Sequence, residues 1–242
     1  MTGKGKSITQ AMTEIQSKHG KEIFLGNNSY IIFGKELAKR GIKPVLSFFN
    51  SSYEQRPTAT VIMSDTTAAD VISNQVTQDI MPAFSLGLVT KKSKGIKSVG
   101  EITFLQIMSD ILSEKRSPYI PIVKVGKNEN DENIYEIKGT AIYKGDKFFT
   151  EIFAKESQGL LWLKGKIKDN YLVVENGDEI FAIFVNSSNA FKRFKIKDGK
   201  PVFDFYIFGT GEIQETIGSN LEWNDEEHVN KVKNIVTAES AK

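Results

Sequence analysis

The sequence contains no cysteine and only two histidines, His19 and His228. Without cysteine, these 242 residues can form no disulfide, no thiolate zinc site and no lipid attachment through sulfur. Neither histidine has a second histidine or a carboxylate at a spacing typical of a metal site, so we expect both to be surface residues. No apolar run approaches the roughly 20 residues of a membrane-spanning helix. The first residues also lack the apolar segment of a signal peptide.

The sequence also has little excess of positive over negative charge. The 32 lysines and arginines nearly cancel the 30 acidic residues, and the net charge is +2. A balance this close argues against nucleic acid as a partner. Forty per cent of the residues are apolar and sixteen are phenylalanine, which is enough for a real hydrophobic core. The length allows one large domain or two ordinary ones.

The first half reads as a mixture of helices and strands. Ser7 is a plausible N-cap, and Asp65 is expected to cap the helix that follows it. The apolar periodicity predicts helices at 7–19, 34–41, 43–49, 67–74, 79–89 and 99–112, and strands at 22–25, 29–33 and 58–63. The apolar face of the last of these helices is predicted to consist of Phe104, Met108, Ile111 and Leu112.

The second half is richer in strands. Pro118 and Pro121 mark a predicted domain boundary, which gives an N-terminal domain at 1–116 and a C-terminal domain at 117–242. Asn176-Gly177 and Asp198-Gly199 predict two hairpins, after strands at 122–127 and 134–143. A helix predicted at 226–236 has valines on one face, and this face needs a sheet or another helix to pack against it. We therefore expect an α+β fold, with a mixed N-terminal part and an antiparallel C-terminal domain.

Residues 139–165 are predicted to form a strand–turn–strand–helix unit, around which the second half is interpreted. They predict a strand, a turn at 144–146, a returning strand and a helix at 154–164 that ends near Gly165. The helix contains Trp162 within the run Leu-Leu-Trp-Leu, which is typical of a core position. We expect the indole to pack inward as part of a platform, so that replacing it by alanine costs about 3–5 kcal/mol.

Several patterns resemble chemical sites but have simpler interpretations. The acidic loop at 128–133 lacks the ligand order of a calcium loop and is interpreted as a solvated hairpin loop. The basic run at 91–97 is typical of an anionic membrane contact or of a charged linker, and we favour the linker. Glu151 and Glu156 are expected to be exposed charges flanking a helix and not an acid/base pair.

The remaining candidates are also weak. Ser157 and Ser93 have no histidine nearby in the sequence to activate them. The segment 209–211, Gly-Thr-Gly, is too short for a phosphate-binding loop. We therefore expect no catalytic, cofactor-binding or metal-binding residue and no enzymatic activity.

Residues 139–166 resemble the Ger(x)C family, the C subunits of the nutrient germinant receptors of spore-forming bacteria. The family segment has the form G-x-A-V-F…D-K-L…E-x-x-G-L-L-W-L-x-G-K. The matching residues are Gly139, Ala141, Ile142, Tyr143, Asp146, Lys147, Glu156, Gly159, Leu160, Leu161, Trp162, Leu163, Gly165 and Lys166. Segments 6–11, 20–24 and 31–38 look like the family's N-terminal region.

The resemblance implies a non-enzymatic receptor subunit that acts as an extracytoplasmic interaction scaffold in spore germination. Its implied partners are the integral membrane subunits of the receptor. The implied location is the outer face of the spore inner membrane, where the full-length family is a lipoprotein in contact with the membrane surface. Relative to that family, the chain is expected to lack the signal peptide, the lipid-modified cysteine and the extreme C-terminal part.

Two other functions stay open from the residues alone. An extracytoplasmic small-molecule-binding module requires a large apolar pocket with a few convergent polar groups. A hydrolase requires a nucleophile within hydrogen-bond reach of a base. A deep polar-lined cleft favours the first, and a close serine–histidine or paired-carboxylate cluster favours the second.

Overall fold

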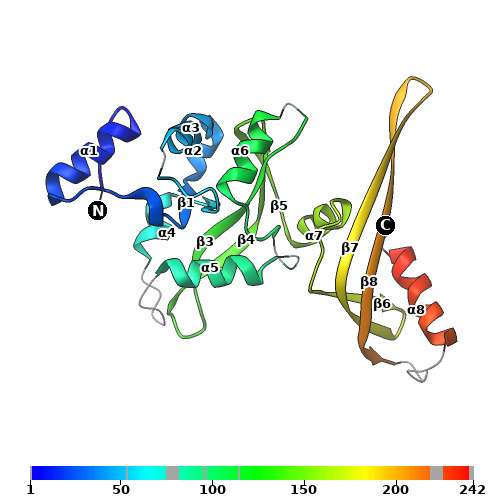
Figure 1. Ribbon diagram of the computed structural model, residues 1–242. Helices are drawn as coiled ribbons and strands as arrows, with labels where there is room; N and C mark the ends of the chain where they lie inside the picture. The colour runs from blue at the N-terminus through cyan, green and yellow to red at the C-terminus, as the bar shows by residue number, and fades with distance from the viewer. Residues whose placement is uncertain are drawn as a thin grey trace. The chain divides into compact units, whose positions relative to one another are not determined.

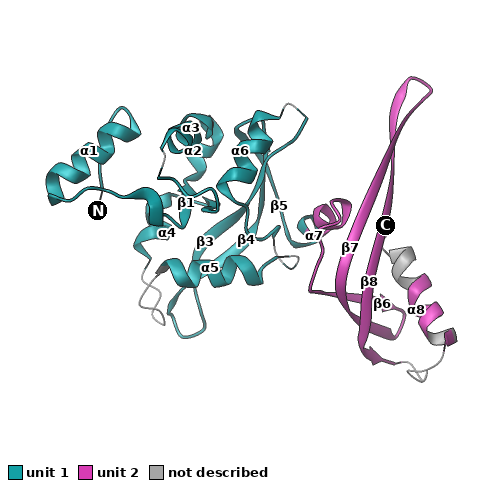
Figure 2. Ribbon diagram, viewed as in Figure 1, with its two compact units in different colours: residues 1–157 teal, residues 158–242 magenta. Residues whose placement is uncertain are grey.

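The computed structural model describes residues 2–52, 54–74, 82–94, 96, 98–113, 115–218 and 226–239. For residues 82, 227, 228 and 235–239 it describes the backbone alone. The chain divides into two compact units, Met1–Ser157 and Gln158–Lys242 (Figure 2). The domain boundary after residue 116 stays a prediction, and the strand that follows it joins the sheet of the first unit.

The first unit holds most of the helices (Figure 1). Its elements are α1 (Ile8–His19), the 3-10 helix η1 (Leu25–Asn27), β1 (Tyr30–Phe33), α2 (Lys35–Arg40), α3 (Lys43–Ser51), β2 (Thr60–Ser64), α4 (Ala68–Ser73), α5 (Pro82–Lys92), α6 (Phe104–Leu112), β3 (Tyr119–Lys127), β4 (Asn133–Lys144) and β5 (Lys147–Ile152). Helix α7 (Ala154–Leu163) contains the boundary between the units.

A mixed five-stranded sheet forms the centre of the first unit, in the order β1-β2-β3-β4-β5. The first three strands are parallel, and the last two continue as antiparallel hairpins. Every residue of β2 is buried, as expected for a strand that is covered on both faces. Helices α4 and α5 pack on one face through Val71 and Leu86. Figure 1 shows α2, α3 and α6 on the other side of these strands.

The second unit is built on a three-stranded antiparallel sheet, in the order β6-β7-β8. Its strands are β6 (Asn170–Asn176), β7 (Glu179–Lys197) and β8 (Lys200–Ile217), and α8 (Glu226–Glu239) packs against β6. Val232 of α8 is buried, so the predicted valine face is covered at that position. Val229 is exposed, and the side chain of Val236 lies outside the described residues.

The α+β class and most predicted elements are confirmed. Ser7 caps α1 by accepting a hydrogen bond from the Gln10 N–H, and Gly20 ends that helix at φ +63°. Both predicted hairpin turns form, with Gly177 and Gly199 at positive φ. The strand predicted at 22–25 is wrong, because η1 begins at Leu25 and the chain before it pairs with no strand.

Two other predictions need correction. The helix predicted at 99–112 begins only at Phe104, because Thr103 adopts the extended N-cap conformation and accepts a hydrogen bond from the Gln106 N–H. Leu112, expected on the buried face of that helix, is exposed. Helix α4 is capped by Thr67 and not by Asp65: the Thr67 side chain and Asp70 form a capping box.

Candidate functional site

Asp65 belongs instead to a cluster of four charged side chains on the first unit. Its Oδ1 accepts hydrogen bonds from Lys35 Nζ at 3.1 Å and from Lys138 Nζ at 3.0 Å. Lys138 also contacts both carboxylate oxygens of Glu151, at 3.1 and 3.2 Å. Lys35 lies 3.9 Å from the same carboxylate. The cluster joins the residue after β2 and the first residue of α2 to β4 and β5.

The electrostatics of this cluster favour a structural role. Burial by itself raises the pKa of the Asp65 carboxyl, but hydrogen bonds from Lys138 and Lys35 outweigh it and leave the pKa below its usual value. Burial lowers the pKa of Lys138, and its bonds to Asp65 and Glu151 raise it further than burial lowers it. Both groups stay charged near neutral pH. Asp65 and Lys138 are therefore not poised to exchange a proton near neutral pH.

The two glutamates considered as an acid/base pair have different partners. Glu151 is half-buried in the charged cluster, so the prediction that it is an exposed helix-flanking charge is wrong. Glu156 is exposed, and its carboxylate accepts a hydrogen bond from the Phe153 N–H at 3.2 Å, beside the start of α7. Sequence analysis missed the cluster because its members lie up to 116 residues apart, between Lys35 and Glu151.

The two serines considered as nucleophiles are buried among hydroxyl groups. Ser157 Oγ lies 2.9 Å from Thr140 Oγ1. Ser93 Oγ donates to the Thr90 carbonyl at 2.9 Å and lies 3.1 Å from Ser98 Oγ. His19 is exposed at the end of α1, and the side chain of His228 lies outside the described residues. The Ser93 hydroxyl closes the turn after α5, and the Ser157 hydroxyl joins the start of α7 to β4.

Two further candidates are ordinary parts of the fold. In the acidic loop, Asn128 Oδ1 accepts from the Asn130 and Glu132 N–H groups, which closes the turn between β3 and β4. No group of three or more potential metal ligands gathers among the described residues. The segment 209–211 lies inside β8, where Thr210 contacts Ser187 at 2.9 Å. Both serve local structure.

The basic run at 91–97 is only partly a linker. Lys91 and Lys92 form the last turn of α5, and Lys94 pairs with Ser98 in an isolated bridge. The linker prediction is therefore wrong for residues 91–94, because the buried Ser93 and Ser98 close the turn. Residues 95 and 97 lie outside the described residues.

The Leu-Leu-Trp-Leu run packs differently from the prediction. Leu161 is fully buried, whereas Trp162 is only half-buried. The indole lies against Gly209 of β8, where an added Cβ would stand 3.4 Å from a ring carbon. The platform therefore rests on the β7–β8 hairpin, and the tryptophan is at its margin and not in its core.

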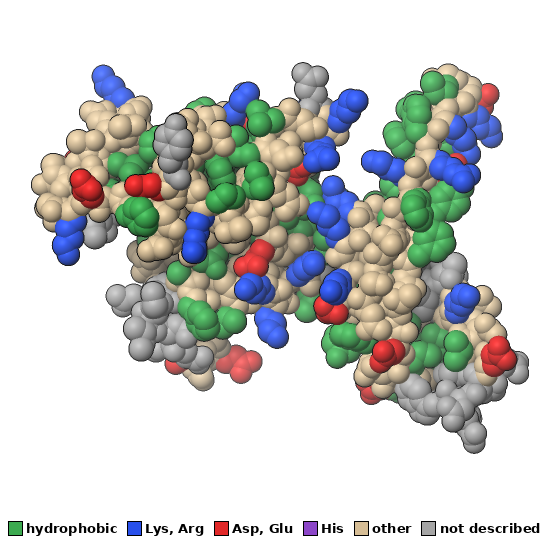
Figure 3. All heavy atoms as spheres, in the orientation of Figure 1, with side chains coloured by type: hydrophobic (Ala, Val, Ile, Leu, Met, Phe, Trp, Pro, Cys, Tyr) green, Lys and Arg blue, Asp and Glu red, His purple; other side chains and the backbone are tan. Residues whose placement is uncertain are grey.

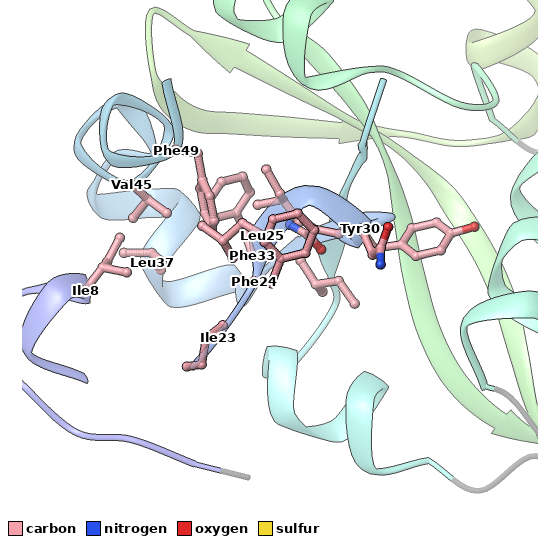
Figure 4. A pocket seen from close by; sticks show the side chains of 13 residues that line it. Ile8, Ile23, Phe24, Leu25, Tyr30, Phe33, Leu37, Val45 and Phe49 are labelled. Carbon is pink, nitrogen blue, oxygen red and sulfur yellow. The ribbon is translucent and has the colours of Figure 1, made fainter. Parts of the chain in front are cut away.

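An apolar groove runs along β1, one of the two edge strands of the five-stranded sheet. Its volume is about 560 Å³, and all four residues of β1 line it. Figure 4 shows Ile8, Leu37 and Val45 gathered at one end, and Tyr30 extending away from them at the other. Asn27 and Asn28 contribute side-chain amides to its lining. Sequence analysis missed this groove because its walls come from α1, α2, α3 and β1.

A second uncovered region is the distal part of the β7–β8 hairpin, residues 187–210, which we call the ribbon. Strand β6 pairs with β7 only as far as Val185, so beyond it β7 and β8 pair with each other alone among the described strands. Figure 3 shows hydrophobic side chains along the ribbon beside lysines and arginines. The groove and the ribbon are both exposed surfaces rich in apolar side chains.

Comparisons with known proteins identify the family of the chain. Residues 1–125 match the family model described as "Spore germination protein N-terminal domain", and residues 138–242 match "Spore germination B3/ GerAC like, C-terminal". The protein YfkR of Bacillus subtilis (strain 168) is 24% identical over 218 residues, which cover 87% of this chain and 55% of YfkR. Spore germination protein B3 of the same organism is 23% identical over 238 residues, 97% of this chain and 63% of that protein.

The fold agrees with a solved structure. The crystal structure of the GerBC protein superposes with a TM-score of 0.64 at 17% identity, over 96% of this chain and 66% of that one. The chain spans about half to two thirds of the length of these relatives. Because the two family models together match most of its residues, the chain belongs to the Ger(x)C family of spore germination proteins, as residues 139–166 predict.

Proposed function

We propose that this chain acts in spore germination as a non-enzymatic C subunit of a nutrient germinant receptor. In this role it serves as an interaction scaffold that docks on the receptor's integral membrane subunits at the outer face of the spore inner membrane. The observation that carries the proposal is the match of both halves of the chain to the germination family. Among the described residues no helix is long and apolar enough to cross a bilayer.

The groove along β1 supports a scaffold role. On one side β1 pairs with β2, and no strand among the described residues pairs with its other side. An edge strand offers unpaired N–H and C=O groups to an extended segment of a partner. The groove beside it gives apolar side chains of such a segment a place to bind. A membrane subunit that adds one strand here would extend the sheet.

The absence of an activated group supports a non-enzymatic role. The family is one of germinant receptor subunits and not a known enzyme family. Among the described residues, the candidate serines bond to hydroxyls and carbonyls, and the charged cluster is fully paired. These groups stabilise the fold, and none of the described candidates is a nucleophile paired with a base.

The test uses two matched exposed phenylalanines. Phe24 lines the groove and is 63% exposed, whereas Phe149 on β5 is 68% exposed and lies outside it. Spores that carry Phe24→Ser should lose co-purification of the membrane subunits and germinate more slowly on nutrients. Phe149→Ser should leave both unchanged. Normal assembly and germination with Phe24→Ser would contradict the groove as the docking site.

One observation favours a small-molecule-binding module as a second candidate. The volume of the groove falls in the range of small-molecule sites, and Asn27 and Asn28 supply polar groups at its wall. Thermal unfolding of the purified chain with a panel of amino acids and sugars tests this. A rise in Tm that Phe24→Ser abolishes supports the second candidate, while unchanged Tm values across the panel count against it.

A further inference from the structure

The ribbon has two different faces. In the register of β7 and β8, Phe194 pairs with Phe203, Lys192 with Phe205 and Ile196 with Pro201. Paired residues share a face of an antiparallel ladder, and alternate pairs change face. One face therefore carries these six residues towards the turn, and the pairs Ala190–Ile207 and Ser188–Gly209 farther from it. The rings of Phe194 and Phe203 lie 5.3 Å apart at its centre.

The opposite face is cationic towards the turn. It presents Arg193, Lys195, Lys197 and Lys200, with Lys195 bonded to Asp204 at 2.8 Å. The same face also carries Val202 and, farther from the turn, Phe191, Tyr206 and Phe208, and the rings of Phe191 and Phe208 lie 6.0 Å apart. Arg193 lies 5.5 Å above the ring of Tyr206, so its charge is held close to the strand. The ribbon as a whole holds five cations and two carboxylates, a net charge of +3, while the whole chain has +2. The positive charge of the protein is thus concentrated here.

The apolar face is open to solvent. Phe194 is 60% exposed and Phe203 is 55% exposed, and no third strand or helix covers them among the described residues. The alternation of Phe203, Phe205 and Ile207 with polar residues predicts a strand that buries one face. A contiguous exposed apolar patch of this kind marks a contact with another molecule or with a membrane.

We propose that the ribbon lies flat on an anionic lipid surface, with its apolar face at the boundary between headgroups and acyl chains. An amphipathic helix at a membrane interface buries its apolar face and keeps its polar face towards water, and the strand pair is oriented in the same way. A two-stranded ribbon is thin, so the cations of its far face remain within the screening length of about 8–10 Å and act on the same lipid charge. Lysine side chains reach sideways to phosphate groups while their stems cover apolar surface.

The charge of the ribbon selects this occupant over a second copy of the chain. Two ribbons packed face to face would bring net charges of +3 together at short range. Binding to anionic lipid is instead strengthened by each cation that lies near the surface. The inference rests on the proposed function only for the presence of a membrane beside the chain. Binding to lipid and assembly with membrane subunits have separate readouts, so one can fail while the other holds.

The experiment is sedimentation of the 242-residue chain with vesicles of phosphatidylcholine and phosphatidylglycerol. The chain should bind them, should bind pure phosphatidylcholine far more weakly, and should dissociate as salt is raised. Phe194→Ser combined with Phe203→Ser should weaken binding more than about tenfold. The matched control is Phe149→Ser, which should bind like the wild type. Because all three side chains are exposed, circular dichroism should be unchanged.

The charge contribution has its own pair of variants. Lys197→Ala with Lys200→Ala should weaken binding to anionic vesicles roughly 30-fold, at about fivefold for each cation. Lys91→Ala with Lys92→Ala removes the same charge from α5 and should have no comparable effect. Three results overturn the proposal: no binding to anionic vesicles, equal binding to neutral ones, or sedimentation of the free chain as a dimer that the serine variants dissociate.

Discussion

Two strands of this protein, β2 and β7, are both rich in residues that favour strands, yet their surroundings differ completely. Every residue of β2 is buried between helices, and Val61, Ile62 and Met63 have no exposed surface. The distal half of β7 is exposed on both faces. Strand formation and burial are therefore decided separately: the first by local preference and turn chemistry, the second by what lies on each face. The first unit supplies its own cover, and the ribbon does not.

The largest effect should come from the core of the first unit. Phe33 of β1 is 1% exposed, so Phe33→Ala should lower the free energy of unfolding by about 3–5 kcal/mol. Phe203→Ala on the ribbon should change it by no more than about 0.5 kcal/mol. Urea denaturation of both variants measures the contrast directly. Equal losses would mean that the ribbon is packed in solution.

The stability loss expected for Trp162→Ala lies between those expected for Phe33→Ala and Phe203→Ala. The indole is half-buried against Gly209, so Trp162→Ala should cost about 2 kcal/mol, less than the value expected for a core ring. Leu163→Ala, at an exposed neighbouring position, is the control and should cost little. Denaturation monitored by circular dichroism gives both values. A loss near 4 kcal/mol for the tryptophan would place it in the core after all.

The charged cluster should give a pH-dependent effect of about 1–2 kcal/mol. The pKa of Asp65 is lower in the folded state, so its contribution to stability is present above the unfolded value near 4 and is lost as pH falls through the folded value. The stability difference between wild type and Asp65→Asn should thus be largest near pH 7 and shrink below about pH 4. Asp131→Asn, in the exposed pair with Lys127, should show almost no difference at any pH.

The smallest predicted effect is a gain. Tyr143 is fully buried in β4, and its hydroxyl has no hydrogen-bond partner among the described residues, so burial raises the pKa of that hydroxyl. Tyr143→Phe removes the unsatisfied group and should raise the free energy of unfolding by about 1 kcal/mol. Tyr135→Phe is the control, because the Tyr135 hydroxyl donates to the Val71 carbonyl at 2.8 Å and its loss should destabilise the fold. A destabilised Tyr143→Phe would indicate a partner for the hydroxyl.

Sequence analysis succeeded where the determinants are local. The N-cap of α1 and both hairpin turns follow from residue types at fixed positions, and each formed as predicted. It failed where partners are distant. Asp65 resembled a helix cap because a helix follows it, but two lysines from other elements engage it instead. The two hairpins predicted at Asn176-Gly177 and Asp198-Gly199 share one continuous strand, β7, because pairing with β8 extends through the residues between the turns.

The most direct test is hydrogen–deuterium exchange of the whole chain with and without phosphatidylglycerol-containing vesicles. In the free chain, amides of the ribbon should exchange much faster than those of β2 and β3, because an uncovered strand pair opens easily. Vesicles should slow exchange at 187–210 and leave the first unit unchanged. Strong protection of the ribbon in the free chain, or no response to vesicles, would contradict the account.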